Sequence, residues 1–425
     1  MKYNDRKGGV LVDAAIWQLF RLATNGRPGA FSPQLRSLVW ELTERDLEMG
    51  CLPDISLFVG PNLTSFSTVV NVDHPLHLTA VRLALQTLPQ SLESLTLMDT
   101  TLSTEKATLQ SLELVHYWSN LRQFVTTLPI SLVDLDFLST LPCLADLSIS
   151  TESQAFPFPD QPHLGTRVSK RGGFAKLTEL NMHHISQVED AAVVLRRLPR
   201  TLRILSIFAS SKLSPTDCNN LISHITELCS PETLTNLTVV CQTDSEAKPH
   251  DIINREDLVK VDITPLLPFQ KLQCLNLLIT PAIYVTPEQA RAIPEAFPDI
   301  ETLCLRGNIK NKFVLNHRFP KIDHTHFLEI VRGCRKLQSI RLEIDATKVT
   351  GQEVPLAEDK KISLQEAGFE QSPIYSGEKF AAFLLAHCPA LTMVWQTWYE
   401  CSDSMYEGRW DVVAQAISGR ASSSV

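Results

Sequence analysis

One apolar phrase, Leu-x-x-Leu-x-Leu or a close variant, recurs along most of the 425 residues of this chain. Clear copies begin at Leu92, Leu132, Leu144, Leu177, Leu202, Leu234, Leu272, Ile300 and Leu337, and weaker copies at Leu35, Leu63 and Leu391. The last three residues of each phrase alternate apolar, polar and apolar, which is the period of a half-buried strand. A lone strand of this kind cannot bury its apolar face, so successive copies must stack on one another.

The segments between the phrases predict helices. Residues 188–198 and 217–228 carry apolar side chains at helical spacing. Thr286-Pro287 with Gln289 has the form of a capped helix start, and Ser214-Pro215 opens in the same way. Helix ends are marked by the cysteines just before a phrase, at Cys229, Cys334 and Cys388. We therefore predict an α/β leucine-rich-repeat solenoid (horseshoe) with parallel strands on the concave face and helices on the convex face.

The phrases also suggest an organisation along the chain. We expect an N-terminal segment at 1–30, irregular repeats at 31–400, and a C-terminal cap with a frayed tail at 401–425. Polar, Pro-containing stretches predict loop insertions near 151–173, 242–257 and 345–377. The phrases that start at Leu132 and Leu144 are too close together for two complete units. One of them should be a connecting segment, and the sequence does not decide which.

Composition limits the partners and the compartment. The net charge is −8, so no global basic field attracts nucleic acid or an anionic membrane. No apolar run reaches the roughly 18 residues of a membrane helix. The ten cysteines form no Cys-x-x-Cys pair, which favours a reducing compartment, cytoplasmic or nuclear. The alternative, a secreted repeat ectodomain, predicts disulfides.

Catalytic signatures are missing from the sequence. It has no phosphate loop, no Rossmann glycine fingerprint, no nucleophile elbow and no zinc-protease helix. We therefore expect no enzyme, no cofactor and no metal. The alternative is a hydrolase or transferase that uses His183 and His184, or the pair His324 and His326; a metal reading would need further ligands from elsewhere. The simpler reading is a polar strand edge and a helix cap.

In a strand of this type, the residues that flank the inward apolar pair point to the concave surface. Those positions supply the predicted partner-binding residues: Asp134, Asp136, Asp146, Glu179, Asn181, His183, Ser206, Phe208, Asn276, Arg306, Arg341, Glu343 and Trp395. The set is acidic early and more basic late, a gradient that would orient an extended protein partner. Phe208 and Trp395 are aromatic anchors of the kind that protein interfaces favour. The alternative is that these are ordinary polar strand positions that face water.

The wording Cys-x-x-Leu-x-x-Leu/Ile-x-Leu at Cys334 to Leu342, looser at Cys388 to Trp395, resembles the cysteine-containing leucine-rich repeats of F-box proteins. The long irregular units and the Trp-rich closing segment are similar to those of fungal F-box/leucine-rich-repeat proteins. The resemblance implies a substrate receptor of a cullin–RING ubiquitin ligase, with a Skp-family adaptor and a cullin as partners and a protein substrate on the repeats. No recognisable F-box opening precedes Leu35, and the amphipathic stretch 10–22 is the candidate for a remnant. The alternative is a repeat adaptor unrelated to ubiquitination.

Overall fold

Parallel strands alternate with helices and turns along the chain. The computed structural model describes residues 14–41, 55–71, 75–99, 118–150, 173–210, 213–241, 261–279, 283–307, 320–369, 372–395 and 404–423. The chain divides into two units, Met1–Ser186 with Arg196–Pro199 and Gln187–Leu195 with Arg200–Val425.

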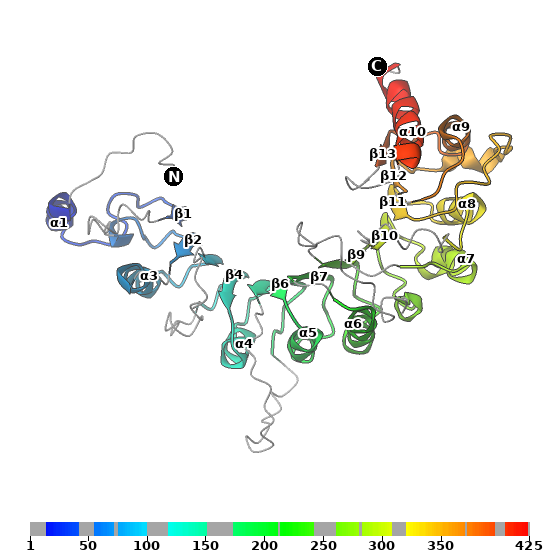
Figure 1. Cartoon of the computed structure of the whole chain (residues 1–425). Helices are drawn as coiled ribbons and strands as arrows, with labels where there is room; N and C mark the ends of the chain where they lie inside the picture. The colour runs from blue at the N-terminus through cyan, green and yellow to red at the C-terminus, as the bar shows by residue number, and fades with distance from the viewer. Residues whose placement is uncertain are drawn as a thin grey trace. The chain divides into compact units, whose positions relative to one another are not determined.

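The first unit contains strands that pair in sequence order. They are β1 (Ser37–Trp40), β2 (Ser65–Val70), β3 (Ser94–Asp99), β4 (Gln123–Pro129), β5 (Asp146–Ser150) and β6 (Glu179–Ile185). All of their recorded pairings are parallel. The connections carry α1 (Ala14–Ala23), η1 (Ile55–Leu57), α3 (Pro75–Thr87) and α4 (Leu132–Ser139). Strands and helices therefore form two layers in this unit (Figure 1).

The second unit repeats the same plan. Its strands are β7 (Ile204–Ala209), β8 (Asn236–Cys241), β9 (Cys274–Ile279), β10 (Thr302–Gly307), β11 (Ser339–Leu342), β12 (Glu366–Gly368) and β13 (Met393–Trp395), again in sequence order. Its helices are α5 (Val188–Leu195), α6 (Pro215–Leu228), η4 (Thr264–Leu266), α7 (Pro287–Ala296), α8 (His324–Gly333), η6 (Ala357–Lys361), α9 (Gly377–His387) and α10 (Ser404–Ser423). The predicted α/β leucine-rich-repeat solenoid is therefore confirmed.

A recurrent hydrogen-bond pattern sets the register between repeats. Where a strand begins, two successive backbone N–H groups donate to one carbonyl oxygen of the preceding repeat. Thr235 and Asn236 donate to the Arg203 oxygen at 2.8 and 3.0 Å, and Gln273 and Cys274 donate to the Thr235 oxygen at 2.7 and 3.1 Å. This pattern aligns equivalent residues of neighbouring strands, so that the inward apolar positions stack into one core.

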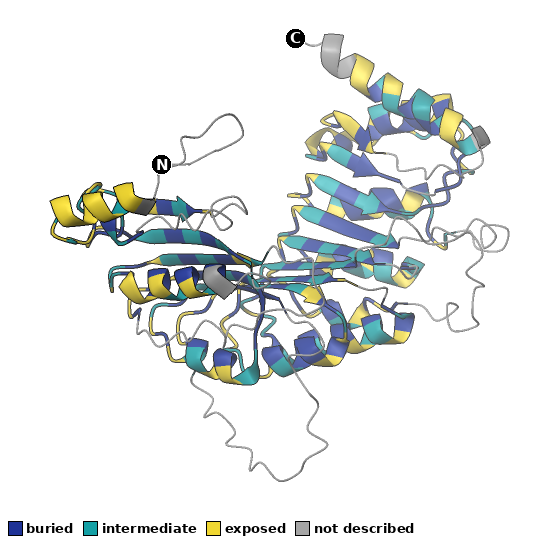
Figure 2. Ribbon diagram, turned by 60° about the vertical axis from the view of Figure 1, so that its left-hand side comes forward, coloured by how far each residue is buried: buried dark blue, intermediate teal, exposed yellow. Residues whose placement is uncertain are grey.

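The burial pattern follows the phrase. Along β7, β8 and β9 the residues alternate between half-buried and buried, and Figure 2 shows this alternation as teal and dark-blue bands along the strands. The inward leucines Leu205, Leu237 and Leu275 are fully buried. Each of these three strands thus has one face in the core and one half-buried face.

The predicted helix boundaries are confirmed at both ends. Thr286 caps α7 and forms a capping box with Gln289, and Ser214 caps α6 in the same way. Cys229, Cys334 and Cys388 are the C-terminal caps of α6, α8 and α9. All three thiols are buried, and burial raises the pKa of each to about 12. They therefore pack as small hydrophobic side chains.

Two repeat strands lie where the sequence did not predict one. In β4 the third apolar position of the phrase is Thr126, which is fully buried and whose hydroxyl accepts a hydrogen bond from the Leu128 N–H at 3.0 Å. In β12 the corresponding sequence is Leu364-Gln-Glu-Ala367-Gly-Phe369, with alanine at the second apolar position of the motif. The interval 345–377, predicted as a loop insertion, therefore contains η6 and a strand of the sheet.

The C-terminal segment is also more ordered than predicted. Helix α10 extends to Ser423 and packs against α9 and β13. Its residues Trp410, Val413 and Ile417 are buried, and the Trp410 indole N–H donates to the Ser372 carbonyl at 3.0 Å. The prediction of a frayed tail within 401–425 is wrong for the residues of α10, Ser404–Ser423. The predicted insertions 151–173 and 242–257 lie outside the described residues, apart from Gly173 at the end of the first.

Candidate protein-binding face

The exposed strand face of the second unit carries a cation–aromatic pair. Arg341 on β11, Gly368 on β12 and Trp395 on β13 are register partners across three neighbouring strands. The Arg341 guanidinium carbon lies 5.3 Å from the centroid of the Trp395 ring. This arrangement is a cation–π interaction, which holds the guanidinium in place over the ring.

Gly368 makes this pairing possible. A Cβ atom at this position would lie 2.9 Å from Cγ of Arg341, closer than real Cβ contacts allow. Any residue other than glycine at position 368 would therefore place a side chain between Arg341 and Trp395. The absence of a side chain lets two residues that are separated by a whole strand touch each other.

Glu366 and Met393 complete this site, which we call the Arg341–Trp395 patch (Arg341, Glu366, Gly368, Met393 and Trp395). The Glu366 carboxylate accepts hydrogen bonds from the Trp395 indole N–H and the Ser339 hydroxyl, each at 3.4 Å. Met393 is 41% exposed and Trp395 is 40% exposed. The patch therefore presents apolar area and a held cation on one strand face.

A second set of residues that are aligned across neighbouring strands of the same unit is mostly apolar. Phe208, Val240 and Leu278 are register partners at the end of β7, β8 and β9, and Arg306 follows on β10. All four are half-buried. The predicted residues Ser206 and Asn276 lie two positions earlier in the same strands, and both lie on the exposed face. Glu343 follows directly after β11.

The strand face of the first unit is polar and internally hydrogen-bonded. The Ser94 hydroxyl donates to Gln123 Oε1 at 2.8 Å, and Gln123 Nε2 donates to Asp146 Oδ2 at 2.7 Å. Burial raises the pKa of Asp146, the hydrogen bond from Gln123 opposes that rise, and the neighbouring Glu179 adds to it. Asn181 Nδ2 donates to Glu179 Oε1 at 3.2 Å. The acidic residues predicted here therefore lie together on one face.

His183 lies on the same face and is paired with Ser148. Its Nε2 lies 3.0 Å from the Ser148 hydroxyl. Burial, and then the neighbouring His184, lower the pKa of the His183 imidazole. Both effects disfavour the charged imidazolium, as expected for a half-buried histidine within a strand.

The placement of Asp134 and Asp136 on the strand face is wrong. Residues 132–139 form helix α4 instead of a strand. Ser131 caps this helix, and Asp134 is the partner in its capping box, with Oδ2 accepting from the Ser131 N–H at 2.7 Å. Asp136 lies on the same helix, where its carboxylate is 3.5 Å from Arg197 Nε. Of the two closely spaced phrases, the one at Leu132 is the connecting segment.

The histidines singled out by the sequence have structural partners on strand β6 and at helix α8. Asp323 caps α8 by accepting from the Thr325 N–H at 3.1 Å, and His326 Nδ1 lies 2.8 Å from the same Asp323 oxygen. His324 is buried against Phe383. In the part of the chain that the structure describes, no group of three or more His, Cys, Asp or Glu side chains is placed to bind a metal ion.

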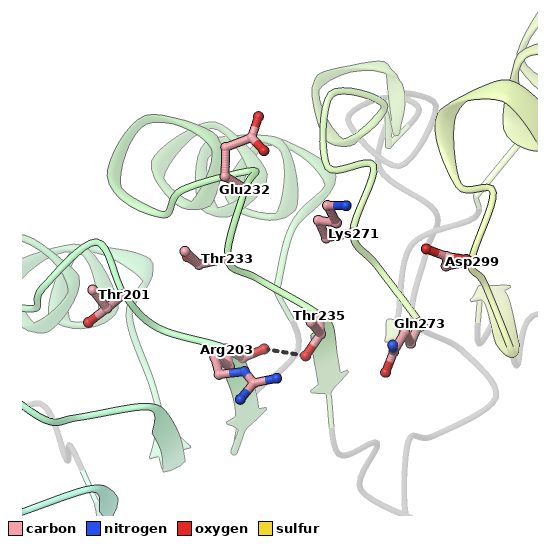
Figure 3. A pocket seen from close by; sticks show the side chains of 8 residues that line it. All are labelled: Thr201, Arg203, Glu232, Thr233, Thr235, Lys271, Gln273 and Asp299. Atoms are coloured by element: carbon pink, nitrogen blue, oxygen red, sulfur yellow. Dashed lines mark hydrogen bonds between the residues drawn. The ribbon is translucent and has the colours of Figure 1, made fainter.

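Sequence reasoning did not identify a shallow pocket of about 330 Å³ where β7, β8 and β9 begin (Figure 3). Its lining is polar and of mixed charge: Thr201, Arg203, Glu232, Thr233, Thr235, Lys271, Gln273 and Asp299. Several of these groups are occupied within the fold. The Thr233 hydroxyl donates to the Arg200 carbonyl at 2.8 Å, the Thr235 hydroxyl to the Arg203 carbonyl at 3.1 Å, and Asp299 pairs with Lys336 at 2.8 Å. These lining residues therefore connect neighbouring repeats. The lining does not bring together a set of side chains suited to catalysis.

Within the described residues, no helix has both the length and the hydropathy of a membrane-spanning segment. No family model matches the chain, and no curated protein matches it. Among solved structures, the chain is similar to one titled "Crystal structure of Rad7 and Elc1 complex in yeast". The sequence identity is 13%, the match covers 90% of this chain and 78% of that chain, and the TM-score is 0.38. The assignment of an α/β leucine-rich-repeat solenoid therefore rests on the strands and helices of this chain itself.

Proposed function

We propose that this chain is a non-enzymatic protein-recognition scaffold whose strand faces hold a protein partner. The observation that carries the proposal is the Arg341–Trp395 patch, where a tryptophan and a methionine, each about two-fifths exposed, lie beside a held arginine. Tryptophan and arginine are enriched among the residues that dominate binding energy at protein interfaces. Because the inward residues of the same strands are buried (Ile340, Leu342, Ala367 and Val394), the exposed side chains of the patch are not needed to close the core.

Within that class, we propose the substrate-receptor role of an F-box/leucine-rich-repeat ubiquitin ligase. It is supported by the repeat wording at Cys334 to Leu342, where the cysteine caps a helix and the leucines enter the next strand. In this role a Skp-family adaptor and a cullin would be partners, and the strand faces would hold the substrate. A repeat adaptor unrelated to ubiquitination would keep the strand-face partner and lack the adaptor and the cullin.

The experiment is affinity purification of the tagged chain followed by mass spectrometry, with strand-face variants and matched controls. Phe208→Ala and Trp395→Ala remove aromatic side chains from the strand face. Tyr375→Ala and Leu83→Ala remove side chains that are 65% and 57% exposed and lie outside the strands. We expect a partner that the wild type and both controls recover equally, and that at least one strand-face variant loses.

The two parts of the proposal have separate outcomes. Repeated purifications without a Skp-family adaptor or a cullin contradict the ligase role. A set of partners that neither strand-face variant changes contradicts recognition by the strand face. Melting temperatures of all four variants are measured first, so that a loss of capture is compared between equally folded chains.

A further inference from the structure

We propose that the Arg341–Trp395 patch binds an extended acidic–apolar peptide segment. A carboxylate of the segment pairs with Arg341, and a nearby leucine-like side chain covers Met393 and Trp395. This inference rests on the proposed function and names the chemistry of the partner. It is carried by four features of the patch: a guanidinium with no carboxylate near it among the described residues, a glutamate that already accepts hydrogen bonds within the patch, exposed apolar area, and the missing side chain at Gly368.

The guanidinium of Arg341 is held but not neutralised. Its contact among the described residues is the Trp395 ring, at 5.3 Å, and within those residues no carboxylate lies within ion-pair distance of it. The guanidinium carries five N–H donors in a rigid fork along the edge of its plane. That edge matches a carboxylate, which arginine binds with two parallel hydrogen bonds.

Glu366 does not supply the carboxylate that would pair with Arg341. Its carboxylate accepts from the Trp395 indole and from Ser339, and it belongs to the register row of Ser339 and Met393 rather than to that of Arg341. The hydrogen bond from the indole N–H orients the Trp395 ring, which in turn contacts Arg341. The glutamate therefore preorganises the site and leaves the arginine donors available.

The apolar half of the site is on the last strand. Met393 and Trp395 lie two residues apart on β13, so both side chains point to the same face, about 7 Å apart. Strands β11 and β13 are separated by β12, which places Arg341 and β13 roughly 9–10 Å apart. An extended peptide that crosses the strands spans this distance in about three residues. We therefore expect the acidic and the apolar residue of the partner to be two or three positions apart.

The probes are short fluorescein-labelled peptides with one Glu and one Leu, two or three positions apart, in a Gly-Ser background. Matched peptides carry Gln for the Glu, or Ser for the Leu. Binding to the full chain is measured by fluorescence anisotropy. We expect either replacement to weaken binding about tenfold, because one removes the charge-assisted hydrogen bonds and the other the apolar contact. A higher salt concentration should weaken the binding of the Glu peptide and leave the binding of the Gln peptide unchanged.

Variants of the chain locate the site. Arg341→Gln should abolish the preference for Glu over Gln, and Met393→Ser the preference for Leu over Ser. Gly368→Val keeps every residue of the patch except the glycine but puts a Cβ 2.9 Å from Cγ of Arg341, which must then move away from the ring, so it should weaken binding about tenfold or more. Its melting temperature is measured as well, so that binding is compared between folded chains. Met98→Ser is the matched control, because Met98 is a 38% exposed methionine on strand β3 of the other unit.

The inference is overturned if no peptide binds, if Glu and Gln peptides bind equally, or if Gly368→Val and Arg341→Gln bind like the wild type. The parent proposal can fail or survive separately. If Phe208→Ala abolishes partner capture while the patch variants do not, the strand face recognises proteins but this patch is not the site. If the peptides bind as expected and no cellular partner depends on the strand face, the patch is a peptide site and the scaffold function is contradicted.

Discussion

The carboxylate of Asp359 accepts a hydrogen bond from Nδ1 of His387 at 2.6 Å, and both side chains are 1% exposed. Arg332 donates to the same carboxylate through Nε at 2.7 Å and through an Nη at 3.0 Å. Burial by itself raises the pKa of Asp359, but the hydrogen bonds from Arg332 and His387 outweigh it and hold the value at about 2. Because the three residues come from η6, α8 and α9, this network ties successive repeats of the second unit together.

We predict that Asp359→Asn lowers the free energy of unfolding by about 3–5 kcal/mol, the cost of removing one member of a buried ion pair. Arg332 and His387 would then lack a negative charge in a buried site. Thermal and denaturant unfolding measure the loss. Glu358→Gln is the control, because Glu358 is exposed on the same turn, and it should change stability by less than about 0.5 kcal/mol. Equal effects of the two substitutions would show that the network contributes nothing.

A second prediction concerns Asp190, which is 1% exposed and whose Oδ2 has no hydrogen-bond partner among the described residues. Burial, and then the charge of Glu189, raise its pKa to about 6. The folded chain therefore binds a proton at Asp190 more tightly than the unfolded chain does, because the pKa of this carboxyl in the unfolded chain is 3.8. Stability contributed by the protonated form is present below about pH 4 and is lost as the pH rises to about 6.

Replacing Asp190 by Asn should therefore stabilise the chain at pH 7, by up to about 3 kcal/mol. The gain should shrink as the pH falls from 6 towards 4, because the wild-type carboxyl is then neutral too. Melting temperatures of both chains between pH 4 and 8 measure this. Glu189→Gln should give a smaller change with the same sign. A difference between the two chains that does not depend on pH would contradict the prediction.

The third prediction uses two glycines near or in helix α10. A Cβ at Gly377 would lie 2.3 Å from the backbone oxygen of Arg409, so α9 and α10 approach each other closely there. Gly377→Ala should cost about 1–3 kcal/mol by overpacking. Gly408→Ala is the matched control, because among the described residues no atom beyond its chain neighbours and the adjacent helix backbone lies within 4 Å of its Cβ position, and alanine favours the helix by about 0.5–1 kcal/mol. Melting curves should therefore shift in opposite directions.

The fourth prediction tests the helix at residues 132–139. The Ser131 hydroxyl accepts from the Asp134 N–H at 3.2 Å, as in a helix cap. Ser131→Ala should lower stability by about 1 kcal/mol, the usual cost of losing such a cap. Ser139→Ala, which removes an exposed hydroxyl at the other end of α4, should change stability by less than about 0.5 kcal/mol. If residues 132–137 formed a strand, the two substitutions would not differ in this way.

The misplacement of Asp134 shows where a local pattern is insufficient. The spacing of Leu132 and Leu135 fits an apolar strand phrase and also fits a helix, in which residues three apart share a face. The structure uses the helical alternative because Ser131 and Asp134 form the cap and because Leu135 and Leu138 are buried together. The reverse error occurs at β12, where Ala367 fills a position that holds a leucine in most other repeats and Gly368 follows it, so the sequence analysis did not recognise this repeat.

The sequence by itself determined the repeat phrase, the alternation of strands and helices, the capping boxes at Thr286 and Ser214, and the cysteine-marked helix ends. These features are local, because each depends on side chains a few residues apart. The tertiary structure alone decided that Arg341 meets Trp395 across Gly368, and that Asp359 joins Arg332 and His387. Those contacts depend on the register of strands and on the packing of successive repeats, which bring together residues that are tens of positions apart.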